Sequence, residues 1–206
     1  MKNGRDPERT RARILDAATR EFARYGLGGA RVDRIAARAR ANKRMLYYYF
    51  GDKDGLFLAA LEARYAHIRN AERSLKLEHL EPREAVRRLV QFTWRYFLEH
   101  PEFMTLLNSE NLHQGRHVRR SQRVREMHSH LVSLLRGVLR RGEEERLFRK
   151  GVDPVQLYIS IAGEGYFYLS NRYTLSRIFG RDLMAPRALS GRARHISEMI
   201  LNALRR

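Results

Sequence analysis

Cysteine is absent from the 206 residues, which excludes disulfide bonds, thiolate metal ligands and a cysteine nucleophile. Long apolar runs are absent too, and none approaches the ~20 residues that a membrane-spanning helix needs. The first 13 residues are polar and basic, without the apolar core of a secretory signal peptide. We therefore expect a cytoplasmic protein that has no membrane partner.

The sequence also lacks the signatures of common catalytic sites. It contains no nucleophile elbow, no dinucleotide fingerprint and no phosphate-binding loop that follows a strand. The i, i+4 pair His113 and His117 could share a helix face and bind a metal, but no carboxylate motif accompanies it and Gly115 interrupts the helix. Solvated histidines on helices are also far commoner than metal ligands. We expect a protein that is not an enzyme, with no catalytic residue, metal or cofactor.

Negative charge is scarce, since 23 Asp and Glu face 41 Lys and Arg and leave a formal net charge of +18. Such a field favours polyanionic partners such as nucleic acid. An arginine-rich proteome would also explain about half of the excess. Positive charge is densest in residues 1–50, with 13 basic against 5 acidic residues, so a nucleic-acid contact is expected there.

Proline occurs only 5 times, and it marks the starts of helical patterns at Asp6-Pro7, Pro82, His100-Pro101 and Asp153-Pro154. No segment alternates with a period of two residues, and no fixed repeat is present. The sequence therefore predicts an all-α fold. The expected helices span roughly residues 6–26, 32–39, 43–50, 52–68, 82–98, 101–115, 118–141 (ending at Gly142), 153–173 and 190–205.

Two short helices predicted at residues 32–39 and 43–50 are separated by about three residues. Their apolar residues lie on one face each, and so tight a turn makes the helices cross steeply, which lets the second enter a major groove. Asn42 is a good N-cap for that second helix. We expect its first turn to display Lys43, Arg44 and Met45 outward.

The segment from Arg11 to Glu62 resembles the DNA-binding domain of the TetR/AcrR family. The matching motifs are Arg13-Ile-Leu-Asp-Ala-Ala, Val32-Asp-Arg-Ile-Ala, Leu46-Tyr-Tyr-Tyr-Phe50 and Lys53-Asp-Gly-Leu56. The resemblance implies a three-helix helix-turn-helix domain over residues 1–55 and a helical ligand-binding and dimerisation domain over residues 56–206. It also implies DNA contacts from Lys43, Arg44, Met45, Tyr47, Tyr48, Tyr49 and Lys53. Arg44 and Met45 occupy the positions that vary most in the family, so we expect them to read bases, although Arg44 could equally bind phosphate.

Two positions depart from the family pattern. Arg40 stands where glycine is usual, at a turn residue that tends toward positive φ, which costs about 1 kcal/mol. Arg31 stands where Ser or Thr usually caps the first short helix, which costs about another 1 kcal/mol. Both add positive charge near the expected DNA surface, although drift in an arginine-rich proteome would place them there as well.

The resemblance further implies a homodimer, with the last two long helices forming a four-helix bundle across a two-fold axis. The predicted helix at 153–173 suits this role, because it is apolar on nearly every side and carries Gly163 and Gly165 for close helix approach. A monomer with a thick core is the alternative. A dimer would place two recognition helices on a pseudo-palindromic operator in double-stranded DNA.

The motifs Asn42-Lys-Arg-Met-Leu, His100-Pro-Glu-Phe103 and Asn108-Ser-Glu-Asn-Leu-His113 resemble a branch of the family that contains repressors of pyrimidine and nicotinate catabolism. This likeness implies a small effector, a nitrogen heterocycle or a carboxylate. Polar or aromatic residues within apolar helices are candidates for its pocket, although each could instead serve a structural hydrogen bond: Trp94, Asn108, Glu110, Asn111, His113, Glu164, Tyr166 and Asn171.

We therefore expect a repressor that a small molecule releases from its operator, since steric occlusion of a promoter requires no polymerase-contacting segment. The alternative is a basic helical adaptor that binds acidic partners without reading a DNA sequence.

Overall fold

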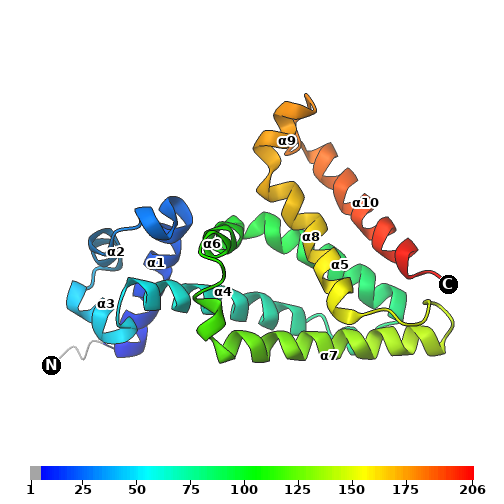
Figure 1. The fold of residues 1–206 in the computed structure, drawn as a ribbon, viewed down its shortest axis with the longest axis horizontal. Coiled ribbons are helices and arrows are strands. Elements are labelled where there is room, and N and C mark those ends of the chain that lie inside the picture. The colour runs from blue at the N-terminus through cyan, green and yellow to red at the C-terminus, as the bar shows by residue number, and fades with distance from the viewer. Residues whose placement is uncertain (1–5) are drawn as a thin grey trace. The chain divides into compact units, whose positions relative to one another are not determined.

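The computed structural model describes residues 6–206, and these residues build an all-helical chain with an isolated antiparallel bridge between Phe148 and Arg205 (Figure 1). The predicted all-α fold is confirmed. Residues 1–5, part of the polar N-terminus, lie outside the described residues. The helices are α1 (Pro7–Gly29), α2 (Val32–Ala39), α3 (Lys43–Phe50), α4 (Lys53–Arg73), α5 (Pro82–Glu99), α6 (Pro101–Leu112), α7 (Gln122–Glu144), α8 (Pro154–Ser170), α9 (Arg172–Ile178) and α10 (Pro186–Leu204), with short 3-10 turns at Leu77–His79 and Val118–Arg120.

The chain divides into two compact units. The first comprises Met1–His67 and Pro101–Arg125, and the second comprises Ile68–His100 and Glu126–Arg206. Helix α6 packs against α1, so it belongs to the N-terminal unit although it lies far along the sequence.

Helix α1 starts where the sequence predicts. The Asp6 carboxylate accepts hydrogen bonds from the backbone N–H groups of Glu8 and Arg9 at 3.0 and 3.3 Å, and Pro7 occupies the first turn. Gly26 adopts φ 65° and ψ 179°, a conformation that breaks the helix before one further turn. The helix predicted to end at Gly26 is thus interrupted at this residue, but it resumes and extends to Gly29.

Helix α6 is tied to α1 and to the turn that follows it by buried hydrogen bonds. The Ser109 hydroxyl accepts from the Leu27 N–H at 3.2 Å. The buried Glu110 carboxylate accepts from the backbone N–H groups of His117 and Val118, each at 2.9 Å, and lies 2.6 Å from the His117 ring. These bonds satisfy backbone groups that would otherwise be orphaned beyond the helix end.

In the second unit, α5 packs against both α8 and α10 (Figure 1). Gly165 of α8 lets the helices approach closely, because a Cβ there would lie 3.3 Å from the Phe97 ring and 3.5 Å from the Trp94 ring. No described atom lies near the corresponding position of Gly163. Gly165 thus allows close packing against α5 of the same chain.

Four predicted helix limits in the second unit are wrong, and the first is the end of α4, which continues past residue 68 to Arg73. Helix α7 continues through Gly142 to Glu144, and the glycine serves packing here, since a Cβ at this position would overlap the Phe148 ring. The helix expected over 153–173 ends at Ser170, since Asn171 leaves helical geometry and α9 begins after it. Helix α10 begins at Pro186 rather than near residue 190, because the proline fits its first turn.

Among residues 6–206, no helix combines the length and the apolar character needed to cross a bilayer.

Candidate nucleic-acid interface and ligand groove

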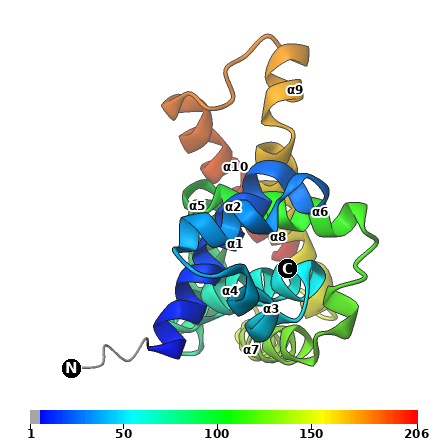
Figure 2. The same cartoon turned by 90° about the vertical axis from the view of Figure 1, so that its left-hand side faces the viewer.

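Helices α2 and α3 have the bounds predicted from the sequence, and Figure 2 turns them toward the viewer together with α1. Asn42 caps α3, since its side-chain oxygen accepts from the Arg44 N–H at 2.9 Å. Leu46, 2% exposed, anchors α3 in the core formed with α1, α2 and α4. An eight-residue helix is marginal alone, so this packing is what holds α3 in place.

The outer surface of α3 is basic and aromatic. Arg44 is exposed, Tyr47 is 44% exposed and Tyr48 is 80% exposed. Tyr49 is partly buried, with edge contacts to the rings on either side of it. Met45, which the sequence predicts to point outward, is partly buried against the core and exposes only part of its side chain.

Lys43, at the start of α3, already has an anionic partner. Its ammonium group lies 2.8 Å from the carboxylate of Asp33 on α2. The hydrogen bond to Asp33 raises the pKa of Lys43 above its ordinary value, so the lysine stays charged. A phosphate would compete with Asp33 for this charge.

The α3–α4 junction fixes Lys53. Asp52 caps α4 by accepting from the Gly55 N–H at 2.7 Å. A Cβ at Gly55 would lie 2.1 Å from the carbonyl oxygen of Phe50, so only glycine fits. Lys53 is the first residue after the cap Asp52, and its Nζ donates to the Gly28 carbonyl at 3.4 Å.

Both departures from the family pattern have structural consequences. Arg40 adopts the left-handed conformation, with φ 48° and ψ 45°, as its position in the turn predicts. Arg31 makes no side-chain cap, but the buried carboxylate of Glu21 accepts from the Arg31 N–H at 3.1 Å and from the Arg34 Nε at 2.6 Å. The sequence reasoning missed Glu21, which continues the inward stripe of α1 and holds the start of α2 through the Arg31 N–H and the Arg34 side chain, without capping the first-turn N–H groups of α2.

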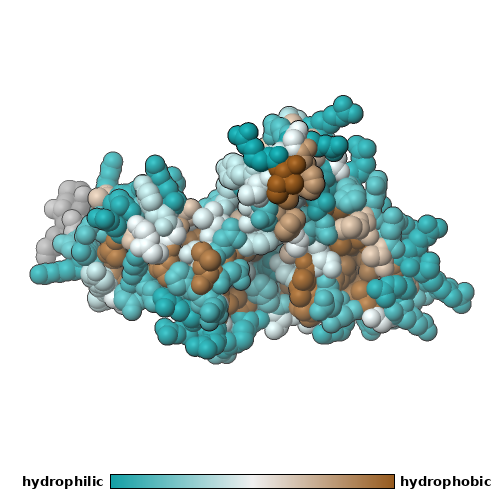
Figure 3. Space-filling view, turned by 45° about the horizontal axis from the view of Figure 1, so that its top comes forward, coloured by the Kyte–Doolittle hydropathy of each residue, from teal (hydrophilic) through white to brown (hydrophobic). Residues whose placement is uncertain are grey.

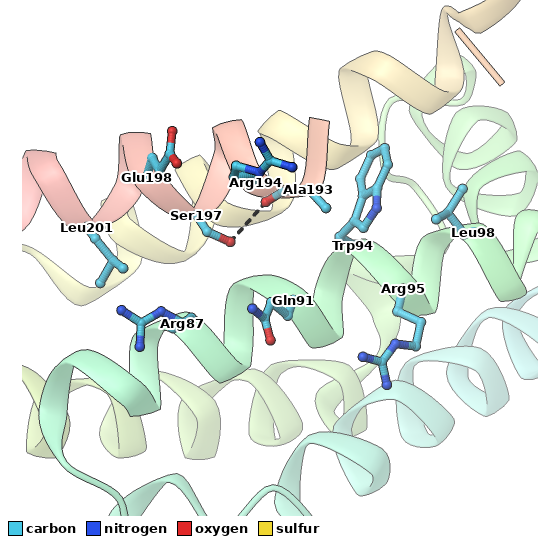
Figure 4. A pocket seen from close by; sticks show the side chains of 10 residues that line it. All are labelled: Arg87, Gln91, Trp94, Arg95, Leu98, Ala193, Arg194, Ser197, Glu198 and Leu201. Carbon is cyan, nitrogen blue, oxygen red and sulfur yellow. Dashed lines mark hydrogen bonds between the residues drawn. The ribbon is translucent and has the colours of Figure 1, made fainter. Parts of the chain in front are cut away.

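The second unit contains a groove between α5 and α10 with a volume of about 750 Å³. Figure 4 shows Trp94, Gln91 and Ser197 in the space between the two helices, with the Arg87 guanidinium toward Leu201. The groove is lined by Arg87, Gln91, Trp94, Arg95, Leu98, Ala193, Arg194, Ser197, Glu198 and Leu201.

Among the residues predicted for an effector pocket, Trp94 is the one that lines this groove. In the second unit, Glu164 forms an ion pair with Arg192, and Asn171 donates to the Phe167 carbonyl within its own helix turn. Tyr166 lies on the same helix and is partly buried.

The other predicted pocket residues belong to the first unit. The Glu110 carboxylate is occupied by the bonds described above, Asn111 donates to the Leu107 carbonyl, and the His113 ring lies 2.7 Å from the Ser109 carbonyl. Asn108 is partly buried on the same helix.

A buried ionic cluster in the second unit was not anticipated. Arg69 and Glu72 of α4 are 3% and 2% exposed, with 2.9 Å between the guanidinium and the carboxylate, and Arg69 donates to the Tyr158 hydroxyl at 2.7 Å. Both Glu72 oxygens lack an aligned hydrogen bond. Burial raises the pKa of Glu72 to about 7 against the opposing effect of Arg69, and burial also raises the pKa of Tyr158. The signal in the sequence was the continuation of the apolar stripe Leu61, Tyr65, Ile68 to position 72.

Comparisons with known proteins agree with this arrangement of helices. A family model described as "Bacterial regulatory proteins, tetR family" matches residues 14–60, and one described as "Tetracyclin repressor-like, C-terminal domain" matches residues 82–200. The HTH-type transcriptional repressor NicS of Pseudomonas putida is 43% identical over 199 residues, covering 97% of this chain and 94% of that protein. The HTH-type transcriptional repressor SCO4008 of Streptomyces coelicolor is 42% identical over 111 residues, 54% of each chain.

The fold is also similar to that of the transcriptional regulator FadR from Bacillus subtilis, solved in complex with stearoyl-CoA. The TM-score is 0.69 at 15% sequence identity, and the match covers 94% of this chain and 99% of FadR. At this identity the likeness concerns the fold alone.

Proposed function

Given that the chain belongs to the TetR family of bacterial transcription regulators, we propose that it represses transcription as a homodimer on a pseudo-palindromic operator and is released by a small effector. The chain is a DNA-binding regulator and not an enzyme. The observation that carries the proposal is the α2–turn–α3 arrangement, with its exposed basic and aromatic surface. We place its action in the cytoplasm, on the nucleoid when bound.

The proposed contacts divide by chemistry. Arg44, exposed in the first turn of α3, reads a guanine through its O6 and N7 acceptors, and the exposed part of Met45 lies beside it. Phosphates are bound by the cations at the two ends of α3 and by its tyrosines: Lys43, Tyr47, Tyr48, Tyr49 and Lys53.

The homodimer is supported by apolar side chains that the chain leaves exposed on one segment. Val155, Ile159 and Phe167 of α8 are 43%, 54% and 59% exposed. Further exposed apolar side chains continue into α9 and the segment after it, at Tyr173, Ile178, Phe179 and Met184. Figure 3 shows brown hydrophobic surface on this segment, bordered by teal hydrophilic side chains. Such a patch favours burial against the same helices of a second copy, with α10 as companion helix.

The effector site that we propose is the α5–α10 groove. It offers the flat ring of Trp94, the amide of Gln91 and the cationic Arg87, which suit a nitrogen heterocycle that carries a carboxylate. The groove is formed in part by α10, so an occupant would favour one dimer geometry and hence one separation of the two DNA-binding heads. A 100-fold loss of operator affinity would correspond to about 2.7 kcal/mol of coupling.

The protein contains a single tryptophan, so the fluorescence of Trp94 tests this site directly. Pyridinecarboxylates and pyrimidines titrated into the dimer should change Trp94 fluorescence in a saturable way, and Arg87→Ala should weaken that binding at least 10-fold. Arg88→Ala is the matched control, because Arg88 pairs with the same Glu84 but does not line the groove. Equal loss in both variants, or no saturable change with any probe, would contradict the site.

The operator itself can be found without knowledge of the regulated genes. Purified protein would be mixed with sheared DNA of the source genome at about 0.15 M salt, and the retained fragments would be sequenced. We expect enrichment of one pseudo-palindrome with half-sites about one helical turn apart. Uniform retention that disappears with added salt would instead support the basic adaptor.

A further inference from the structure

Another groove, lined by basic side chains, lies in the N-terminal unit, and none of the α3 residues proposed to contact DNA lines it. Its volume is about 530 Å³, and it lies between α1 and the C-terminal end of α2. The groove is lined by Arg9, Ala12, Arg13, Asp16, Ala17, Arg38, Ala39 and Arg40.

Its arginines converge from three places in the chain. Arg9 and Arg13 are one turn apart on α1, Arg38 lies in the last turn of α2, and Arg40 lies in the turn before α3. All four are exposed.

The positive charge of this groove is not compensated within the described part of the chain. Among residues 6–206, no carboxylate lies within ion-pair distance of any of these four guanidinium groups. The acidic residue of the lining, Asp16, is paired with Arg20 outside the groove at 3.1 Å. Four like charges around one hollow repel one another, and an anion between them would relieve that repulsion.

Arg40 adds a second unfavourable feature. Its left-handed backbone, with φ 48° and ψ 45°, would be unstrained with glycine. The turn thus keeps a cationic side chain in a conformation that disfavours side chains. Lys76, Gln114 and Arg146 also have positive φ, so the backbone of Arg40 supports a binding role only together with the convergence of the four arginines.

We propose that this groove binds phosphates of the DNA backbone next to the half-site that α3 reads, as a contact separate from α3 and from Lys53. The inference rests on DNA binding as described above. The occupant is the DNA backbone, because Ala41 and Asn42 alone separate Arg40 from α3, so this arginine of the groove lies close in the chain to the recognition helix. Contacts to phosphates raise affinity for every sequence and leave base preference unchanged.

The test replaces Arg40 by glycine and measures thermal unfolding together with the salt dependence of operator binding. Relief of backbone strain should raise the Tm by roughly 2–4 °C. Loss of one phosphate contact per protomer should make the slope of log Kobs against log salt less negative by about 0.9 per contact, and lower affinity at 0.15 M salt on the order of 5-fold per contact. The expected result is therefore a more stable protein that binds DNA more weakly.

Arg146→Gly is the matched control. Arg146 is also exposed and left-handed, with φ 58°, but it belongs to the second unit. It should raise the Tm similarly and leave the salt slope unchanged. Arg38→Gln, a change on an exposed helix position, should reduce the slope as Arg40→Gly does.

The outcomes separate this inference from the function on which it rests. If wild-type protein prefers its operator but Arg40→Gly and Arg38→Gln keep the wild-type slope, the groove does not bind phosphate. Equal slope changes in Arg40→Gly and Arg146→Gly would show an effect of net charge only, which also overturns the inference. Absence of operator preference in the wild type would instead contradict the regulator itself.

Discussion

In the proposed DNA complex, Arg44 and Lys53 have different roles because their side chains differ in chemistry. Arg44 presents a planar fork of donors from the first turn of α3, whereas Lys53 presents a point charge held at the start of α4. A fork can distinguish guanine from other bases, and a point charge binds any phosphate. Removal of the Arg44 side chain should therefore change base preference, whereas removal of the Lys53 side chain should change overall affinity.

Arg44→Ala should reduce preference at one base pair of each half-site by about 1–3 kcal/mol, while Lys53→Ala should weaken binding to all sequences alike. Affinities for the operator and for variants at each position, measured at one salt concentration, check this. An unchanged base preference in Arg44→Ala would show that Arg44 binds phosphate.

Glu72 makes the stability of the second unit depend on pH. Its pKa is raised to about 7 in the folded protein from an ordinary value of 4.5, so the folded state binds more protons between these values than the unfolded state does. Protonated Glu72 therefore favours the folded state below pH 4.5, and this contribution to the free energy of unfolding is lost as the pH rises through about 7. Glu72→Gln should therefore stabilise the protein by about 2–3 kcal/mol at pH 8 and by little at pH 4.5.

Thermal unfolding at pH 4.5 and pH 8 checks this prediction, with Glu62→Gln as a control for removal of a nearby carboxylate on the same helix. An equal effect of Glu72→Gln at both pH values would contradict the raised pKa.

At the scale of helices, the sequence predicted the functional elements better than the dimerisation and pocket elements. Helix α3 begins after its N-cap Asn42 and ends at its C-cap Gly51, and adjacent residues encode both caps. By contrast, the glycine at position 142 serves packing against the Phe148 ring and does not end α7, and the burial of Glu72 depends on the packing around it. The helical stripe Leu61, Tyr65, Ile68 indicates that position 72 faces inward, but the partners that a carboxylate meets there come from packing. The α5–α10 groove likewise joins segments about 100 residues apart in the chain, so neighbouring residues do not encode it.

The α3–α4 junction should tolerate no side chain at Gly55. Gly55→Ala places a Cβ against the Phe50 carbonyl and should destabilise the N-terminal unit by about 1–3 kcal/mol, with loss of DNA binding. Gly137→Ala, in open space on α7, should instead be neutral or stabilising by up to about 1 kcal/mol. Chemical denaturation of both variants compares them, and a neutral Gly55→Ala would show that the junction relaxes.

For the whole molecule, the proposed recognition of a pseudo-palindromic operator requires two copies of the chain. The exposed apolar segment of α8 and α9 is where the second copy should bind, and a charge placed there would have to be buried without a partner. Specific recognition of a two-fold operator follows only if this interface holds both DNA-binding heads in one assembly.

Ile159→Glu should convert the dimer to monomers at micromolar concentration and abolish tight operator binding. Leu112→Glu is the matched control, because Leu112 is an equally apolar side chain, 83% exposed, on α6 of the first unit. Sedimentation velocity distinguishes the two. A dimer that survives Ile159→Glu, or a monomeric wild type, would exclude this interface.

The most direct test of the central claim is the ratio of affinities for the selected operator and for a shuffled sequence of the same length and composition, measured at about 0.15 M salt. A sequence-specific dimer predicts a ratio of at least about 10³, which should fall when either half-site is scrambled. A ratio near one, with both affinities falling equally as salt is added, would contradict the account and leave a basic helical protein that binds any polyanion.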